Sequence, residues 1–104
     1  MKTVLVTGGS RGIGKAIVKE FAKNNYNVIL NYNKSYEAAK EVEDEYKNVK
    51  IFRADVSNPK DVQQMIAFAN EQFGKIDVLI NNAGIGCTGL LQDLSYDEWQ
   101  NVFK

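Results

Sequence analysis

Four short runs of mostly apolar residues recur along the chain, and they predict the strands of a sheet. They are Val4–Val6, Val28–Leu30, Val49–Phe52 and Val78–Ile80. The apolar residues in them are largely β-branched and occupy consecutive positions rather than alternate ones. This pattern is typical of strands that are buried on both faces of a parallel sheet.

The segments between these runs carry apolar residues at helical spacing, which predicts three helices. Their apolar stripes consist of Ile13, Ile17 and Phe21 with Ala16 beside them, of Ala39, Val42 and Tyr46, and of Val62, Met65, Ile66, Ala69 and Phe73. Asn58 and Pro59 suit the start of the third helix, and Gly74 suits its end. A capping pattern at 95–98 predicts a fourth helix, which carries Trp99, Val102 and Phe103.

Strand and helix therefore alternate, and right-handed crossovers turn that order into a doubly wound α/β sheet with helices on both faces. The pattern alone leaves open an α/β domain of another kind. With 104 residues, of which 44% are apolar, the chain suits one domain, residues 1–104, with a modest core.

Composition and charge exclude several classes of function. Thirteen basic residues balance thirteen acidic ones, so no net charge favours nucleic acid or an anionic membrane surface. No apolar run approaches the roughly 20 residues that span a bilayer. The chain has no histidine, which removes histidine-based triads and most zinc sites, and we predict no metal site. The single cysteine, Cys87, excludes an internal disulfide and suits a cytoplasmic location.

A glycine-rich segment stands where the first predicted strand meets the first predicted helix. It reads Gly8-x-x-x-Gly12-x-Gly14. Glycines there allow a tight turn, a close approach of the backbone to a pyrophosphate, and close packing of helix on strand. The helix N-terminus also offers N–H groups and the positive end of its dipole to phosphates. The segment therefore predicts dinucleotide binding, although glycines also mark ordinary turns.

Three motifs in this order resemble those of the short-chain dehydrogenase/reductase family. They are Thr7-Gly8-x-x-x-Gly12-Ile13-Gly14, Asp55-Val56 after the third strand, and Asn81-Asn82-Ala83-Gly84 after the fourth. Two further segments, 10–14 and 97–99, are similar to the 3-oxoacyl-carrier-protein reductase branch of the family. The resemblance covers the whole chain. It implies the amino-terminal part of a Rossmann-like fold, with strand order 3-2-1-4.

The resemblance also implies which residues bind a nicotinamide dinucleotide. Around the pyrophosphate these are Gly8, Gly12 and Gly14, which shape the turn, and Ser10, Arg11 and Ile13, which contact the cofactor. Asp55 would accept from the adenine amino group, and Val56 would place its backbone beside the ring. The ribose would be lined by Asn82, Ala83 and Gly84, while Asn81 would tie neighbouring strands together. Two alternatives stay open: a turn aspartate at position 55, before Ser57, and ordinary loop residues at 81 and 82.

The stretch after the second strand bears on the choice of cofactor. NAD-selective sites normally place a carboxylate there to accept from the ribose 2′-hydroxyl. This chain reads Asn31-Tyr32-Asn33-Lys34-Ser35 and has no acid before Glu37. A 2′-phosphate would meet no repulsion there, and the cations Arg11 and Lys34 would attract it. We therefore predict NADP(H) in preference to NAD(H), with Asn31 and Lys34 among the contacts. The alternative for Lys34 is a solvated surface charge.

The resemblance implies catalysis by a tyrosine, a lysine four residues later and a serine, with an asparagine organising a water relay. Two Tyr-x-x-x-Lys patterns occur, Tyr36 to Lys40 and Tyr46 to Lys50, but the family's pair follows a fifth strand. The places where the serine is expected hold other residues, Lys23 and Asn33. We therefore expect the catalytic half to be absent and predict no catalytic residue among these 104.

The function that the resemblance implies is the cofactor-binding part of an NADP(H)-dependent carbonyl reductase, which transfers hydride to a ketone such as a 3-oxoacyl thioester. The alternative is a non-catalytic dinucleotide-binding module. Expected partners are the dinucleotide and a small carbonyl substrate, with neither nucleic acid nor membrane. We also expect homo-oligomers, because the implied strand order leaves 78–80 as an open edge and Trp99 and Phe103 suit helix pairing.

Overall fold

Parallel strands and helices alternate along the chain as the hydrophobic pattern predicts. The computed structural model describes residues 1–82 and 90–91. The elements, in chain order, are β1 (Thr3–Val6), α1 (Gly12–Lys23), β2 (Asn27–Tyr32), α2 (Tyr36–Glu45), β3 (Val49–Arg53), α3 (Pro59–Phe73), β4 (Val78–Ile80) and β5 (Leu90–Leu91). The predicted helix after Ser95, with Trp99 and Phe103, lies outside the described residues, as do Ala83, Gly84 and Cys87.

The five strands among the described residues form one sheet with the order β3-β2-β1-β4-β5, which confirms the predicted 3-2-1-4 order of the first four. β1 lies in the middle and pairs in parallel with both β2 and β4. The prediction that Val78–Ile80 forms an open edge is wrong. β5 pairs with β4 in the antiparallel direction, so that Leu79 stands opposite Leu91 and Ile80 opposite Leu90. The chain thus covers part of that edge with its own backbone.

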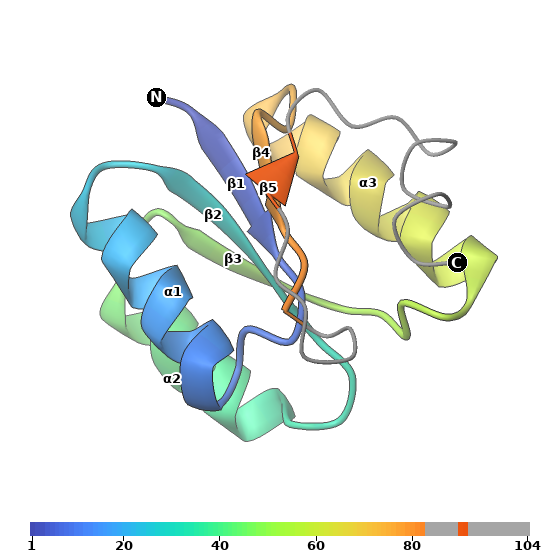
Figure 1. Cartoon of the computed structure of the whole chain (residues 1–104), viewed down its shortest axis with the longest axis horizontal. Helices are drawn as coiled ribbons and strands as arrows, with labels where there is room; N and C mark the ends of the chain where they lie inside the picture. The colour runs from blue at the N-terminus through green and yellow to red at the C-terminus, as the bar shows by residue number, and fades with distance from the viewer. Residues whose placement is uncertain (83–89, 92–104) are drawn as a thin grey trace.

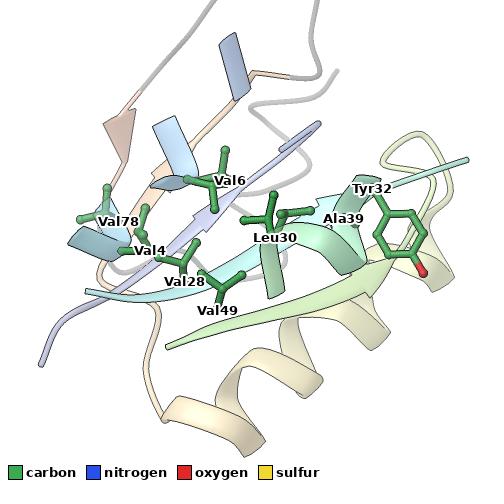
Figure 2. Packing of buried hydrophobic residues seen from close by; sticks show 11 residues of the cluster. Val4, Val6, Val28, Leu30, Tyr32, Ala39, Val49 and Val78 are labelled. Carbon is green, nitrogen blue, oxygen red and sulfur yellow. The ribbon is translucent and has the colours of Figure 1, made fainter. Parts of the chain in front are cut away.

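Helices cover both faces of the sheet, as expected: α1 and α2 lie on one side and α3 on the other (Figure 1). Successive residues of β1 point to opposite faces. Val4 and Val6 pack in the cluster beneath α1 and α2, together with Val28 and Leu30 of β2 (Figure 2). Leu5 belongs to a second cluster, under α3. Because both faces are buried, the strands are apolar at consecutive positions.

The inner face of α1 differs from the predicted stripe by one position. Its buried residues are Gly14, Val18 and Ala22, and Ile17 is only partly buried. Ile13 is 72% exposed, and Ala16 is exposed as well. The missing side chain at position 14 lets the first turn of α1 lie against the backbone of Gly8 and the side chain of Asn82, and this contact turns that face of the helix inward. Ile13 is therefore not part of the core.

The predicted ends of α3 are confirmed. The side chain of Asn58 accepts hydrogen bonds from the N–H groups of Lys60 and Asp61, and Pro59 is the first helical residue. Gly74 follows the helix with a φ of 81°, a conformation that favours glycine. None of the described helices is long and apolar enough to cross a membrane.

β3 is an edge strand of the sheet, and α2 covers part of its hydrogen-bonding edge. The N–H of Ile51 donates to Oε2 of Glu43 at 3.1 Å, and the N–H of Val49 donates to the carbonyl oxygen of Tyr46 at 3.3 Å. Oε1 of Glu43 lies 2.8 Å from Nζ of Lys40. Two of the outward N–H groups are thus satisfied inside the chain. Such coverage makes an edge less available to a strand of another molecule.

Candidate dinucleotide-binding site

The glycine-rich turn connects the carboxyl end of β1 to α1, and its shape depends on residues without side chains. Gly8 and Gly12 have φ values of 62° and 58°, in the left-handed region. A Cβ on Gly9 would come within 2.9 Å of Val18 and 3.0 Å of Leu30. Gly9 therefore sits directly on the core, a role that the sequence reasoning missed because it counted only Gly8, Gly12 and Gly14.

Gly14 brings the start of α1 against the turn that precedes it. A Cβ at this position would collide with the carbonyl oxygen of Gly8 and lie 2.5 Å from Nδ2 of Asn82. Nδ2 of Asn82 donates to that same carbonyl oxygen at 3.1 Å. The turn, the first helical residues and the end of β4 are therefore packed as one unit.

Two asparagines after β4 lie beside the glycine turn. The backbone N–H of Asn82 donates to Oγ1 of Thr7 at 2.9 Å, and Oγ1 of Thr7 lies 3.4 Å from Oδ1 of Asn81. Asn81 is buried between the ends of β1 and β4, and the N–H of Thr7 donates to the carbonyl oxygen of Ile80 at 3.1 Å. The hydroxyl of Thr7 joins these groups. Thr7 is part of the motif on which the resemblance rests, but the resemblance assigned it no role.

The N-terminus of α1 suits an anion. Arg11 is its N-cap and makes no side-chain capping bond, and no acidic residue stands in the first turn. The other two described helices, α2 and α3, carry Glu37 and Asp61 in their first turns. The Cβ direction of Gly12 meets nothing within 4 Å among the described residues. N–H groups at such a helix start bind phosphate oxygens, so the residues present fit the pyrophosphate of a dinucleotide.

The predicted contacts around this turn differ in exposure. Arg11, Gly12 and Ile13 are exposed, whereas Ser10 is buried. Of these residues, Ser10 is therefore the least accessible to a ligand.

Asn31, which was predicted among the cofactor contacts, turns its side chain into the protein. The residue is 2% exposed. Its Oδ1 accepts from the N–H of Gly8 at 3.2 Å, and its Nδ2 donates to the carbonyl oxygen of Ala54 at 3.0 Å. The carbonyl oxygen of Asn31 accepts from the N–H of Gly9 at 2.9 Å. Asn31 therefore ties the glycine turn to the end of β3.

Asp55 shows the turn geometry that the sequence left open as an alternative. Its Oδ1 accepts from Oγ of Ser57 at 2.7 Å and from the N–H of Ser57 at 2.9 Å. These hydrogen bonds hold the pKa of the Asp55 carboxyl below its ordinary value of 3.8, and the bond from the Ser57 hydroxyl has the largest effect. The charges of Arg53 and Lys34 lower this pKa further. The second carboxylate oxygen, Oδ2, has no hydrogen bond within the described part of the chain.

A small polar network beside Asp55 was missed by the sequence reasoning. The guanidinium of Arg53 donates from Nε to the carbonyl oxygen of Asn33 at 3.2 Å and from Nη2 to its Oδ1 at 2.7 Å. Nη1 of Arg53 lies 3.0 Å from Oδ2 of Asp61, which also accepts from the N–H of Asp55 at 2.9 Å. Lys34, which is exposed, follows directly in the chain after Asn33.

The two Tyr-x-x-x-Lys patterns lie on α2 and at its exit. Nζ of Lys40 is 2.8 Å from Glu43 and 3.3 Å from Asp44, and these hydrogen bonds raise the pKa of Lys40. Its ammonium is thus engaged by carboxylates on its own helix. Tyr46 packs against the core cluster under α1 and α2. No group of three or more potential metal ligands occurs in residues 1–82 or 90–91.

Comparison with known proteins places the chain. The family model of the short chain dehydrogenases matches residues 2–104. The chain belongs to the short-chain dehydrogenase family. A relative named 3-oxoacyl-(acyl-carrier-protein) reductase FabG, from Staphylococcus epidermidis, is 43% identical over 97% of this chain. Glucose 1-dehydrogenase 2 of Bacillus subtilis is 38% identical over the same share.

Solved structures of short-chain dehydrogenases share the fold. One from Burkholderia cenocepacia, in complex with NADP, is 40% identical, with a TM-score of 0.76 over 93% of this chain. One from Bacillus anthracis is 38% identical, with a TM-score of 0.74 over 80% of this chain. The chain spans 43% of the length of the staphylococcal reductase and 41% of the Burkholderia structure. Family and fold confirm the resemblance.

Proposed function

We propose that this chain is the NADP(H)-binding part of a short-chain carbonyl reductase. The observation that carries the proposal is the start of α1, which has neither a capping side chain nor an acid and is packed against a turn built from glycines. The NADP in the Burkholderia structure supports the same class of ligand. When bound, the dinucleotide supplies hydride, and the residues of this chain bind and orient it.

In this proposal, a different group of residues binds each part of the cofactor. The pyrophosphate lies against the turn formed by Gly8, Ser10, Gly12, Ile13 and Gly14. Oδ2 of Asp55 accepts from the adenine amino group, and the backbone of Val56 lies beside the ring. Asn82, Ala83 and Gly84 line a ribose, the last two being outside the described residues. Asn31 keeps a place in the site as the side chain that holds the turn, not as a contact.

The preference for NADP(H) rests on charge. Arg11 and Lys34 are exposed cations, and no acid stands between Asn31 and Ser35. Both cations attract a 2′-phosphate, and a guanidinium matches phosphate oxygens with a planar pair of donors.

Titration of the chain with NADPH and with NADH, followed by fluorescence or calorimetry, tests this preference. We expect the chain to bind NADPH more tightly than NADH. The Arg11→Ala variant should lose affinity for NADPH by about tenfold or more, since a charge-assisted hydrogen bond contributes about 1.5–3 kcal/mol. Lys23→Ala, an exposed cation in the last turn of α1, serves as the control and should leave both affinities unchanged. Tighter binding of NADH, or an Arg11→Ala variant that binds NADPH as before, contradicts the preference.

We propose a ketone as the substrate, a 3-oxoacyl thioester by analogy with the named activity of the staphylococcal relative. A second candidate function is a non-catalytic dinucleotide-binding module, and the engaged ammonium of Lys40 favours it for these 104 residues. NADPH oxidation with a ketone distinguishes the two. We expect none above background from these residues alone. Steady turnover that Tyr36→Phe or Tyr46→Phe abolishes would show that one of these patterns is catalytic after all.

A cytoplasmic location stays part of the proposal and rests on the single cysteine.

A further inference from the structure

The adenosine end of the proposed site is built from two loops that one ion pair joins. The loop after β2 carries Lys34, and the loop after β3 carries Asp55. Arg53, the last residue of β3, reaches across to Asn33 in the first loop. On its other side it meets Asp61, in the first turn of α3.

Asp61 links this ion pair to the second loop. Its Oδ2 accepts from Nη1 of Arg53 at 3.0 Å and from the N–H of Asp55 at 2.9 Å. The Ala54–Asp55 peptide group is thereby held on both sides, because its carbonyl oxygen accepts from Nδ2 of Asn31. On the N–H side, this peptide group is held by a carboxylate oxygen that it shares with Arg53.

We infer that Arg53 and Asp61 are positioning residues for cofactor selectivity. They set the separation between Lys34, proposed to meet the 2′-phosphate, and Asp55, proposed to meet the adenine. This inference rests on the proposed function. The pair acts through other residues and touches no part of the ligand itself.

The geometry of Arg53 supports an indirect role. Each of its three guanidinium nitrogens has a protein acceptor: two on Asn33 and one on Asp61. The paired contact with the backbone and side-chain oxygens of Asn33 needs a rigid planar fork, which lysine lacks. Holding Asn33 by two bonds also restricts the loop in which the next residue is Lys34.

Exposure argues against a mainly stabilising role for the pair. The Arg53 side chain is 52% exposed and that of Asp61 20% exposed. Ion pairs at the surface contribute only about 0–1 kcal/mol to folding stability, because water and salt screen them. The same contacts can still fix where a loop stands. If the pair had a mainly structural role, its loss would weaken the binding of NADPH and NADH alike. If it places Lys34, its loss changes the ratio of the two affinities.

The test compares the dissociation constants of NADPH, NADH and adenosine 2′,5′-bisphosphate for the unsubstituted chain and for Arg53→Ala, Arg53→Lys and Asp61→Asn. We expect each substitution to lower the NADPH-to-NADH preference by about fivefold, the low end of coupling between separate groups. Affinity for the bisphosphate should fall by a similar factor. Lys60→Ala removes an exposed cation next to Asp61 in the chain and should leave the ratio unchanged. Asp61→Asn keeps an acceptor for the Asp55 N–H, so it reports on the ion pair even where Arg53→Ala unfolds.

The outcomes separate the inference from the function on which it rests. An unsubstituted chain that prefers NADPH, with variants that keep the same ratio, overturns the inference alone. So does full rescue by Arg53→Lys, because it would show that charge suffices without the planar fork. An unsubstituted chain that binds neither dinucleotide overturns the proposed function. One that binds both equally overturns the proposed preference, and the inference with it.

Discussion

Gly14 and Asn82 lie so close that a Cβ on Gly14 would stand 2.5 Å from Nδ2 of Asn82 and would also collide with the carbonyl oxygen of Gly8. Gly14→Ala should therefore push α1 away from the turn and destabilise the fold by about 2–3 kcal/mol, as overpacking does. Dinucleotide binding should be lost with it. Urea unfolding and the NADPH titration measure the two effects.

Gly74→Ala is the matched control for Gly14→Ala. It places a side chain at a φ of 81° where the described residues leave open space, at the end of α3 that leads into the opposite end of the sheet. We expect a loss of stability of about 1–2 kcal/mol, from strain, with NADPH affinity unchanged. A Gly14→Ala variant that binds NADPH normally would show that the close contact is unnecessary for the site.

Asn31→Leu should destabilise the chain although leucine is larger and more apolar. The substitution leaves the N–H of Gly8 and the carbonyl oxygen of Ala54 without their partner in a buried place. Each unsatisfied group costs about 1–3 kcal/mol, so we expect a decrease of about 2–4 kcal/mol in the free energy of unfolding. Asn24→Ala, which removes an exposed amide at the end of α1, should change it by less than about 0.5 kcal/mol. Equal effects would contradict the buried bridging role.

The carboxyl of Asp55 should make stability depend on pH in the acid range. Its pKa in the folded chain lies below the ordinary 3.8, because the hydroxyl and N–H of Ser57 donate to it. Its contribution is therefore fully present above about pH 4 and is lost as the pH falls through the folded-state pKa. Ser57→Ala removes the hydroxyl and should move the pKa of Asp55 back up, which an NMR titration of the carboxyl measures. Ser35→Ala is the control, and an unchanged pKa in Ser57→Ala would contradict the assignment.

Glu43→Ala should increase self-association of the chain through β3. The substitution removes the acceptor of the Ile51 N–H and opens the edge of the sheet. Glu43→Gln retains an acceptor and should behave like the unsubstituted chain. Glu41→Ala removes an exposed charge on the same helix and serves as the control for net charge. Sedimentation at several concentrations measures the effect, and equal association of the Glu43→Ala and Glu41→Ala variants would argue against a protective contact. Oligomerisation of the unsubstituted chain stays a prediction.

The sheet and its helices could be predicted because their signals are local. Val4–Val6 and Val28–Leu30 are apolar at consecutive positions since helices cover both faces, and this is visible in any window of the sequence. The error at Ile13 has a different cause. Periodicity counts apolar side chains, but the face of α1 is set by the absence of one, at Gly14, against the carbonyl oxygen of Gly8.

The parts of the site that were missed depend on contacts between distant residues. Asn31 was predicted among the cofactor contacts because the stretch after the second strand holds no acid, but the partners of its side chain, Gly8 and Ala54, each lie 23 positions away. Arg53 is exposed, Asp61 is partly buried, and the two are eight positions apart, a spacing that carries no periodic signal. Pairing of β5 with β4 involves only two residues on the β5 side, too few for a strand pattern.

The central position of β1 has a consequence for how the chain folds. Val4 pairs with Val28 and with Val78, so the contact with β4 closes a loop about three times as long. Chain closure on that scale costs about 1 kcal/mol more in entropy, and contacts distant in sequence form more slowly. We expect β1, β2 and β3 to assemble first and β4 to dock last. The bonds from Asn82 to Thr7 and Gly8 are then the last to form, so nicotinamide fluorescence during refolding should rise only in the slowest phase.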